Sequence, residues 1–267
     1  MKRGLASAAF AIASLLALDA SAENALASPM PEMPPGQDGY GYGYRYPYGR
    51  RPLPPEHDAP RTSLWTGVRV GLEAPVGDSF EDLAGTRFTE RNLVGAGPLG
   101  EVDVGGRFGR SFLPFLFFAH TFATRGNGSI PRGVENGFLM DVSPTASPTS
   151  SATNVLGFGF RYEFHPDDFG FAAEMAFGLR FTSTTWSDGT RLSAQAPGEL
   201  RIGIGALIRT SKVFVVSPMV RLGAGTYSDV TESGSGTRDH NVAGPTTMHG
   251  YVGFDVGGHF DLFGKYD

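Results

Sequence analysis

The sequence predicts an all-β protein: an eight-stranded antiparallel up-and-down transmembrane β-barrel that follows a disordered N-terminal segment. First, eight segments after residue 63 alternate large apolar side chains with small or charged ones, at the two-residue period of a strand. Second, short and long links alternate between these segments, which is typical of a barrel with turns at one end and loops at the other. Third, the 267 residues include only 18% charged residues but 38 glycines and 12% aromatic residues. That composition argues against a disordered chain or a helical bundle.

The first 22 residues have the pattern of a signal peptide. Lys2 and Arg3 give a positive start, an uncharged run extends from Gly4 to Leu18, and Ala20-Ser21-Ala22 offers a cleavage site of small residues. An N-terminal membrane anchor is the alternative, but the run is shorter than the ~20 apolar residues of a spanning helix. The chain has no cysteine, which excludes disulfides, thiol catalysis and a lipoprotein anchor. We therefore expect an exported protein, and the net charge of −5 gives no reason to expect a nucleic-acid partner.

Residues 23–62 form a segment of different composition. It holds nine prolines and the tract Gly39-Tyr-Gly-Tyr-Gly-Tyr-Arg-Tyr-Pro-Tyr48. Such a composition cannot bury a core, so we expect a disordered spacer before a barrel of residues 63–267. Binding of a partner by the tyrosine- and arginine-rich tract is the alternative interpretation.

The eight expected strands follow from the alternating pattern, and in chain order they are residues 64–74, 99–108, 112–124, 154–164, 170–184, 199–209, 213–226 and 248–263. The expected short links are residues 109–111, 165–169 and 210–212, and the expected long links are 75–98, 125–153, 185–198 and 227–247. This arrangement places both chain ends on the side of the short turns. Asp78 to Glu81 has the spacing of a capped helix start, which predicts a helical turn in the first long link. Pro114 and Pro218 each predict a bulge or a strand end, because proline cannot donate to the ladder.

The two faces of these strands differ in size and charge. Between residues 170 and 184, Phe171, Met175 and Phe177 share one face, whereas Glu174 and Arg180 share the other with small residues. A large apolar face suits lipid, and a face of glycine, alanine and paired charges suits a narrow interior. We therefore predict an interior charge network of Arg69, Glu73, Glu101, Asp103, Arg107, Arg161, Glu163, Glu174, Arg180, Glu199, Arg201, Arg209, Arg221, Asp255 and Asp261. A soluble, lipocalin-like barrel with these faces reversed remains an alternative.

Two strands follow the pattern less clearly. Residues 112–120 are apolar on both faces, and we predict Leu113, Phe115, Phe117 and Ala119 outward, with His120 inside. Residue Leu99 is grouped with the outward residues of its strand. Aromatic residues near the strand ends predict two girdles at the membrane boundaries, and they comprise Phe108, Phe112, Phe164, Phe169, Phe171, Phe214 and Phe260 near the short turns and Phe122, Phe181, Trp186, Tyr227 and Tyr251 near the long loops.

The last strand contains Asp255-x-Gly257-x-x-Phe260-x-Leu262, which is similar to the C-terminal assembly signal of outer-membrane barrels. Together with the strand count, the loop asymmetry and the faces, this makes Leu64–Phe263 resemble the eight-stranded barrels of the OmpA and OmpX type. That family usually ends at its final aromatic residue, whereas four residues follow Phe263 here. The resemblance implies insertion into the outer membrane of a Gram-negative-type cell by the barrel-assembly machinery, with both termini periplasmic. Members serve as structural anchors, adhesion platforms, conduits or enzymes, so the resemblance implies no single function.

The sequence assigns no catalytic, cofactor-binding or metal-binding residue. The nearest candidate for lipid-modifying chemistry is the weak grouping of Asp239, His240 and His249 with Ser228 and Ser233. The favoured function is structural, in envelope integrity or in surface interaction through the loops with an unknown extracellular partner. A narrow ion or small-solute conduit is the first alternative, since eight strands leave an interior that side chains just fill. A soluble ligand-binding barrel is the second.

Overall fold

The computed structural model describes residues 57–81, 87–89, 91, 94–126, 134–135, 138–139, 147–187, 189, 191–234, 237–241 and 247–266. The expected signal peptide and most of the expected spacer therefore lie outside the described residues. Among the described residues, no helix has the length and apolar character needed to cross a bilayer.

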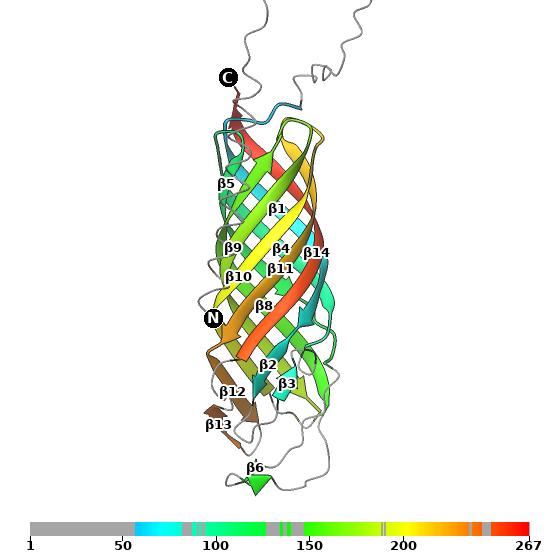
Figure 1. Ribbon diagram of the computed structural model, residues 1–267, viewed down its shortest axis with the longest axis vertical. Helices are drawn as coiled ribbons and strands as arrows, with labels where there is room; N and C mark the ends of the chain where they lie inside the picture. Colours follow the sequence, from blue (N-terminus) through cyan, green and yellow to red (C-terminus); the bar gives the residue numbers. More distant parts are fainter. Residues whose placement is uncertain are drawn as a thin grey trace, which may run out of the picture. The chain divides into compact units, whose positions relative to one another are not determined.

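Eight long antiparallel strands close into a ring (Figure 1). Each strand pairs with its neighbour in the chain, β10 also pairs with β11, and β14 returns to β1. The predicted fold class, an eight-stranded antiparallel up-and-down barrel, is therefore confirmed. The ring strands are β1 (Thr62–Val76), β4 (Gly97–Phe108), β5 (Phe112–Thr121), β8 (Pro148–Phe164), β9 (Phe169–Trp186), β10 (Arg191–Arg209), β11 (Phe214–Tyr227) and β14 (Thr247–Lys265).

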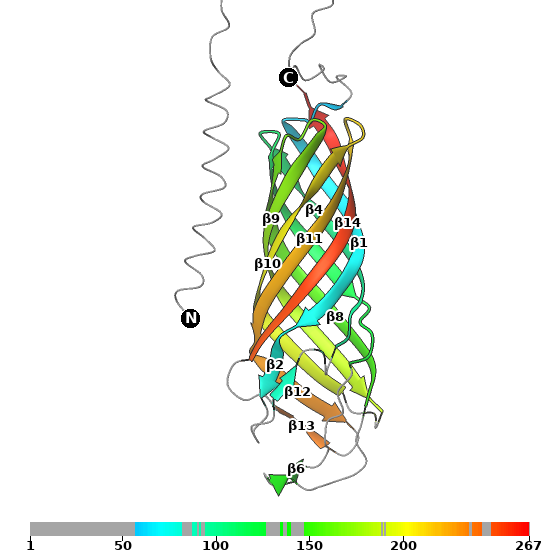
Figure 2. The same cartoon turned by 45° about the vertical axis from the view of Figure 1, so that its right-hand side comes forward.

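The first and last strands close the barrel. β1 and β14 pair antiparallel from Thr62 opposite Lys265 to Val76 opposite Gly250. Figure 2 shows the end of β14 beside the tight turns that connect β4 to β5, β8 to β9 and β10 to β11. We call this the short-turn end and the opposite one the loop end. Both ends of the described barrel chain lie at the short-turn end.

The loop end carries small strands that extend beyond the ring, namely β2 (Asp78–Glu81), β3 (Arg87–Thr89), β6 (Val134–Glu135), β7 (Phe138–Leu139), β12 (Asp229–Gly234) and β13 (Thr237–Asn241). The helical turn expected at Asp78–Glu81 is wrong, because these residues form a hairpin with β3. Pairing with a second strand satisfies the same backbone groups that the capping pattern would have satisfied in a helix.

The expected long link over residues 185–198 is also wrong. β9 continues to Trp186 and β10 begins at Arg191, so only four residues connect them. The first part of β10 pairs with β9 on one side and with β12 on the other. A register shift between Ala196 and Glu199 absorbs Pro197 and Gly198. The serines and threonines here led the sequence pattern to indicate a loop, whereas they belong to a sheet that extends beyond the barrel wall.

The two strand prolines lie inside continuous strands. Pro114 pairs with Phe160 of β8, and Pro218 pairs with Val256 of β14. On the other side of each proline the strand pairing is interrupted without a change of register. The interruptions lie between the pairs Gly105–Phe115 and Phe108–Phe112, and between the pairs Gly205–Met219 and Ile208–Val216. The bulges expected there are therefore absent from these strands, because each proline turns its missing donor toward only one neighbour.

Candidate functional site

The outer surface of the ring carries a continuous apolar belt. On β9, the outward side chains at every second position from Phe169 to Phe181 are apolar and exposed, except for the half-buried Ala173 and Met175, and the next outward residues are Ser183 and Thr185. This stretch spans about 40 Å of strand at ~3.3 Å per residue, or about 30 Å of height at a strand tilt of ~40°. Every ring strand contributes an exposed apolar residue: Val70, Val102, Leu116, Leu156, Phe171, Ile204, Leu222 and Phe254.

Of the two expected aromatic girdles, the one near the short turns is more complete than the one near the loops. Near the short turns, Phe108, Phe112, Phe169, Phe171 and Phe260 are exposed on the outer face. Near the loops, Phe122 and Phe181 are exposed, but Trp186, Tyr227 and Tyr251 are buried inside the barrel. Those three residues were wrongly predicted to lie at the membrane boundary, because the ring strands extend further than their apolar stretches.

The interior holds a high density of charge. All fifteen residues of the predicted charge network are buried, with at most 6% of the surface of any of them exposed. Among the described residues, they comprise seven arginines and eight carboxylates. Burying a charge is costly unless it is paired and hydrogen-bonded, so the contacts of these groups decide whether the interior is stable.

At the short-turn end, Asp261 is held by two arginines. Arg107 binds both Asp261 oxygens, at 2.8 and 3.0 Å, and also binds Glu163 at 2.8 Å. Arg209 binds Asp261 at 2.9 Å and donates to the carbonyl oxygens of Pro166 and Lys212 at 2.6 and 3.0 Å. These carbonyls lie in two of the short turns, so one arginine joins the turns to the interior network.

A short N-terminal segment crosses the same end. His57 Nδ1 donates to the carbonyl oxygen of Arg209 at 3.0 Å, and the Ala59 amide donates to Asp167 at 2.9 Å. Arg110 donates to the carbonyl oxygen of Ala59 at 3.2 Å and pairs with Asp167 at 3.3 Å. Residues 57–61 are thus hydrogen-bonded to turns on different sides of the ring.

The centre of the interior is organised around two arginines. Arg69 binds Asp103 at 2.7 Å and Glu174 at 2.8 Å, which joins strands β1, β4 and β9. Arg221 binds Asp255 at 2.9 Å and Glu101 at 2.8 Å. These ion pairs connect strands on opposite sides of the ring.

Toward the loop end, Arg201 continues the network from Glu101, at 2.9 Å, to Glu199, at 3.0 Å. Arg180 pairs with Glu199 and with Glu73, the latter at 3.0 Å. Beyond these charges, toward the loop end, lies a buried apolar cluster that consists of Val94, Trp186, Leu192, Ala194, Ala196, Tyr227 and Val230. Paired charges therefore extend along the barrel as far as this apolar cluster.

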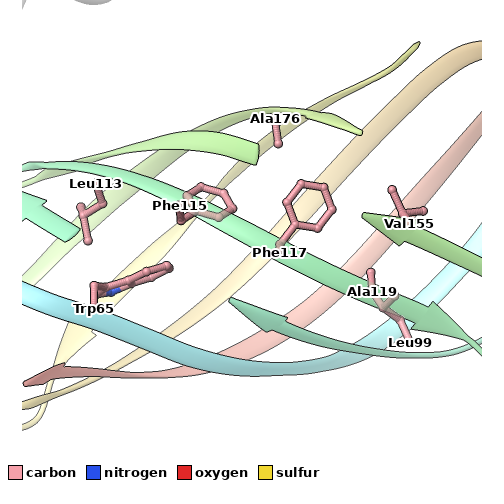
Figure 3. Close-up of a cluster of buried hydrophobic side chains, with 8 residues drawn as sticks. All are labelled: Trp65, Leu99, Leu113, Phe115, Phe117, Ala119, Val155 and Ala176. Carbon is pink, nitrogen blue, oxygen red and sulfur yellow. The ribbon is translucent and has the colours of Figure 1, made fainter. Parts of the chain in front are cut away.

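One side of the interior is apolar (Figure 3). Its cluster consists of Trp65, Leu99, Leu113, Phe115, Phe117, Ala119, Val155 and Ala176. The predicted outward orientation of Leu113, Phe115, Phe117 and Ala119 is therefore wrong, as is that of Leu99, and His120 belongs to the outer face with Asn154, to which it is hydrogen-bonded at 2.8 Å. The physical reason is that two of these rings contact buried arginines. The Arg69 and Arg201 guanidinium groups lie 5.6 and 4.7 Å from the ring centres of Phe115 and Phe117, respectively, and a cation is attracted to the face of an aromatic ring.

The structure also places together three residues that the sequence did not connect. Ser217 Oγ lies 2.9 Å from His259 Nε2, and His259 Nδ1 lies 3.6 Å from Asp103 Oδ1. The residue types match a hydrolytic triad, but all three are buried and Arg161 also approaches His259 Nε2, at 3.4 Å. The His259 ring is stacked on Trp65 with their centres 4.5 Å apart. A substrate could reach Ser217 only if the barrel opened. In this structure, Ser217, His259 and Asp103 therefore contribute packing and hydrogen bonds to the interior.

The weak catalytic grouping of the sequence is not assembled around His249. That side chain is buried in the interior, 3.3 Å from Glu199, and its ring lies against the Tyr227 ring at an angle of 33°, with their centres 4.4 Å apart. Ser228, in contrast, lies at the exposed end of β11. Asp239 and His240 belong to β13, of which the structure describes only the backbone. In the described part of the chain, no group of three or more histidine, aspartate or glutamate residues is placed to hold a metal ion.

Comparisons with known proteins find likeness in fold alone. No protein-family profile matches the sequence, and no curated protein matches it. Neisserial surface protein A is 8% identical over 75% of this chain and 99% of its own, with a TM-score of 0.47. The outer-membrane protease OmpT of Escherichia coli is 9% identical over 75% of this chain and 97% of its own, with a TM-score of 0.45. Ail, the attachment invasion locus protein of Yersinia pestis, is 13% identical over 74% of this chain and 99% of its own, with a TM-score of 0.37.

Proposed function

We propose that this chain is an outer-membrane barrel of a Gram-negative-type cell and that it acts as a closed, rigid anchor. Its role is structural, in envelope integrity or in holding the extended strands of the loop end at the cell surface for interaction. The observation that carries this proposal is the filled interior, in which seven arginines and eight carboxylates are buried among the described residues. In the part of the chain that the structure describes, ion pairs such as Arg69–Glu174 and Arg221–Glu101 cross the interior, which supports a closed barrel.

The apolar belt supports a location in the membrane. Soluble proteins seldom expose a continuous apolar surface of this extent, whereas a membrane barrel requires a band about 25 Å tall. In the last strand, Phe260 and Leu262 of the expected assembly signal are exposed on the outer face, and Asp255 and Gly257 face inward. The proposed barrel-assembly machinery would contact Phe260 and Leu262, because these two side chains lie on the lipid-facing side of β14. The short-turn end would then be periplasmic.

The location predicts heat modifiability. Outer-membrane fractions run in SDS without boiling should contain a folded form that migrates apart from the boiled form, because a closed barrel resists SDS. Recovery of the protein from the periplasm without detergent, with no shift on the gel, would contradict the membrane assignment. The phenylalanine-rich outer face would then be the ligand-lined core of a soluble barrel with its faces reversed.

The filled interior predicts that the barrel does not conduct ions. The purified barrel should show no stepwise current in a planar bilayer, because Arg69, Arg180 and Arg221 bind carboxylates across the lumen. Glu174→Gln and Arg180→Gln test the conduit alternative, since each changes one charge of the network. Stepwise currents in the natural protein that change with either substitution would establish a narrow conduit and overturn the closed anchor.

A further inference from the structure

Residues 57–61, here called the strap, are fastened to several elements at the short-turn end. Their hydrogen bonds reach the end of β10, the turn between β8 and β9 and the turn between β4 and β5. The Arg61 amide also donates to the carbonyl oxygen of Lys265 on β14 at 2.9 Å. Only 1% of the Ala59 surface is exposed. The strap is therefore packed against elements from four separate places in the chain.

The end of β14 is fastened to the same region. The pairing of β14 with β1 shifts by one residue at Phe263, whose φ is 55°. A φ in this left-handed region is rare for an aromatic residue, and it persists only where the surroundings fix it. Beyond this bulge, the Tyr266 hydroxyl donates to the carbonyl oxygen of Lys212, in the turn between β10 and β11, at 3.1 Å. Both ends of the described barrel chain thus hold the short turns.

Unfavourable backbone conformations gather where the strap binds. Among the described residues, the non-glycine residues with a positive φ are Arg110, His165 and Phe263. Arg110 binds the strap directly, and the turn that contains His165 also contains Asp167, which accepts the Ala59 amide. Contacts with the strap therefore stabilise the end of the barrel whose backbone is least favourable by itself.

The strap is also connected to the buried charges of this end. His57 binds the carbonyl oxygen of Arg209, whose side chain binds Asp261. Arg107 donates to the carbonyl oxygen of Arg110, whose own side chain binds the strap. Arg107, Arg209 and Asp261 are each only 1% exposed. Release of the strap would loosen the groups that hold these charges, and entry of water weakens the attraction between them.

The strap can reach all its partners only after the ring has closed. From residue 57 to residue 61 the chain spans at most about 14 Å. Its partners belong to three different hairpins and to β14, and β14 reaches this position by pairing with β1. The contacts of the strap therefore form after ring closure, and they must break before the barrel opens at this end.

We propose that the strap and residues 263–266 form a latch that closes the short-turn end once the ring is complete. Release of this latch is the first step in opening the barrel from that end. The proposal deepens the closed anchor proposed above and rests on it, because it identifies the part of the chain that keeps the anchor closed. The carrying observation is that one five-residue segment is bonded to three hairpins and to the last strand.

Asp167→Ala tests the latch from the side of the turn. This substitution removes the acceptor of the Ala59 amide and the ion-pair partner of Arg110. For the protein in lipid vesicles, the rate of unfolding in urea should rise about fivefold, the effect of roughly one lost hydrogen bond, whereas the rate of refolding stays unchanged. Contacts that are absent from the transition state affect unfolding alone. Asp168→Ala removes an exposed carboxylate from the same turn and should change neither rate.

A reversible cross-link tests the latch within a single protein. A Cβ atom at Gly264 would lie 2.9 Å from the Cβ atom of Pro60, and the Cβ atoms of a disulfide are about 3.8 Å apart, so a shift of about 1 Å allows the bond. The chain has no cysteine, so Pro60→Cys/Gly264→Cys can form only this bridge. The variant is refolded in the reduced form, shown to be heat-modifiable and then oxidised. The oxidised form should unfold about tenfold more slowly than the same protein after reduction.

The outcomes separate the latch from the anchor. Equal unfolding rates of the oxidised and reduced forms would overturn the latch, because the barrel would then open with the strap in place. Failure of the bridge to form in the folded protein would contradict the packing of the strap on β14. Slower refolding of Asp167→Ala, without faster unfolding, would show that the strap docks before the ring closes. A heat-modifiable barrel with unchanged rates would defeat the latch alone and leave the membrane anchor intact.

Discussion

Arg69→Met should destabilise the folded barrel by about 3–5 kcal/mol, the usual cost of removing one partner from a buried ion pair. Arg69 is fully buried and binds Asp103 and Glu174 at 2.7 and 2.8 Å. Without it, the remaining ion-pair partner of Glu174 among the described residues is Arg221 at 4.0 Å, and Asp103 keeps the His259 ring at 3.6 Å. Urea unfolding of the protein in lipid vesicles measures the loss.

Two further variants separate charge from side-chain loss at this site. Arg110→Met removes an arginine whose side chain is 40% exposed and which pairs with Asp167 at 3.3 Å, and it should cost no more than about 1 kcal/mol. Adding Asp103→Asn and Glu174→Gln to Arg69→Met removes the uncompensated charges and should recover most of the lost stability. A loss below about 1 kcal/mol for Arg69→Met would mean that water compensates the buried carboxylates and that the network does not hold the barrel together.

Gly71→Val should prevent β1 and β14 from closing the ring, at a cost of about 2–3 kcal/mol or more, because overpacking forces the backbone to shift. Gly71 is opposite Asp255 in the pairing of these two strands. A Cβ atom at this position would lie 2.7 Å from the Cα atom of Asp255, and closer still to the carbonyl oxygen of Phe254. The neighbouring strand itself is in the way, so no change of side-chain rotamer can relieve the contact. The fraction of heat-modifiable protein after refolding into vesicles measures closure.

Gly100→Val is the matched control for this substitution. Gly100 also lies in a ring strand, but an added Cβ atom there would meet nothing within 4 Å. Valine favours strands, so this variant should refold as well as the natural protein. Equal refolding of the Gly71 and Gly100 variants would show that β1 and β14 can separate locally without loss of the fold.

The alternation of the sequence was enough to predict where most side chains lie, because a strand reverses its side-chain direction at each residue. Glu174 and Arg180 share the face of small residues in the sequence, and both are buried in the structure. The pattern failed on β5, where apolar residues occupy both faces, and hydropathy then contains no information about direction. At Trp186 and Tyr251 it failed because aromatic residues near strand ends occur both in membrane girdles and in barrel interiors.

The strand period, the count of ring strands and the small, charged face could be predicted from the sequence, since these depend on neighbouring residues along the chain. Which arginine meets which carboxylate depends on the closed barrel, because the stagger between strands brings residues such as Arg201 and Glu101 together from opposite sides of the ring. The same is true of the inward orientation of Phe115 and Phe117. Their rings cover the Arg69 and Arg201 guanidinium groups, and that contact exists only once the barrel has closed.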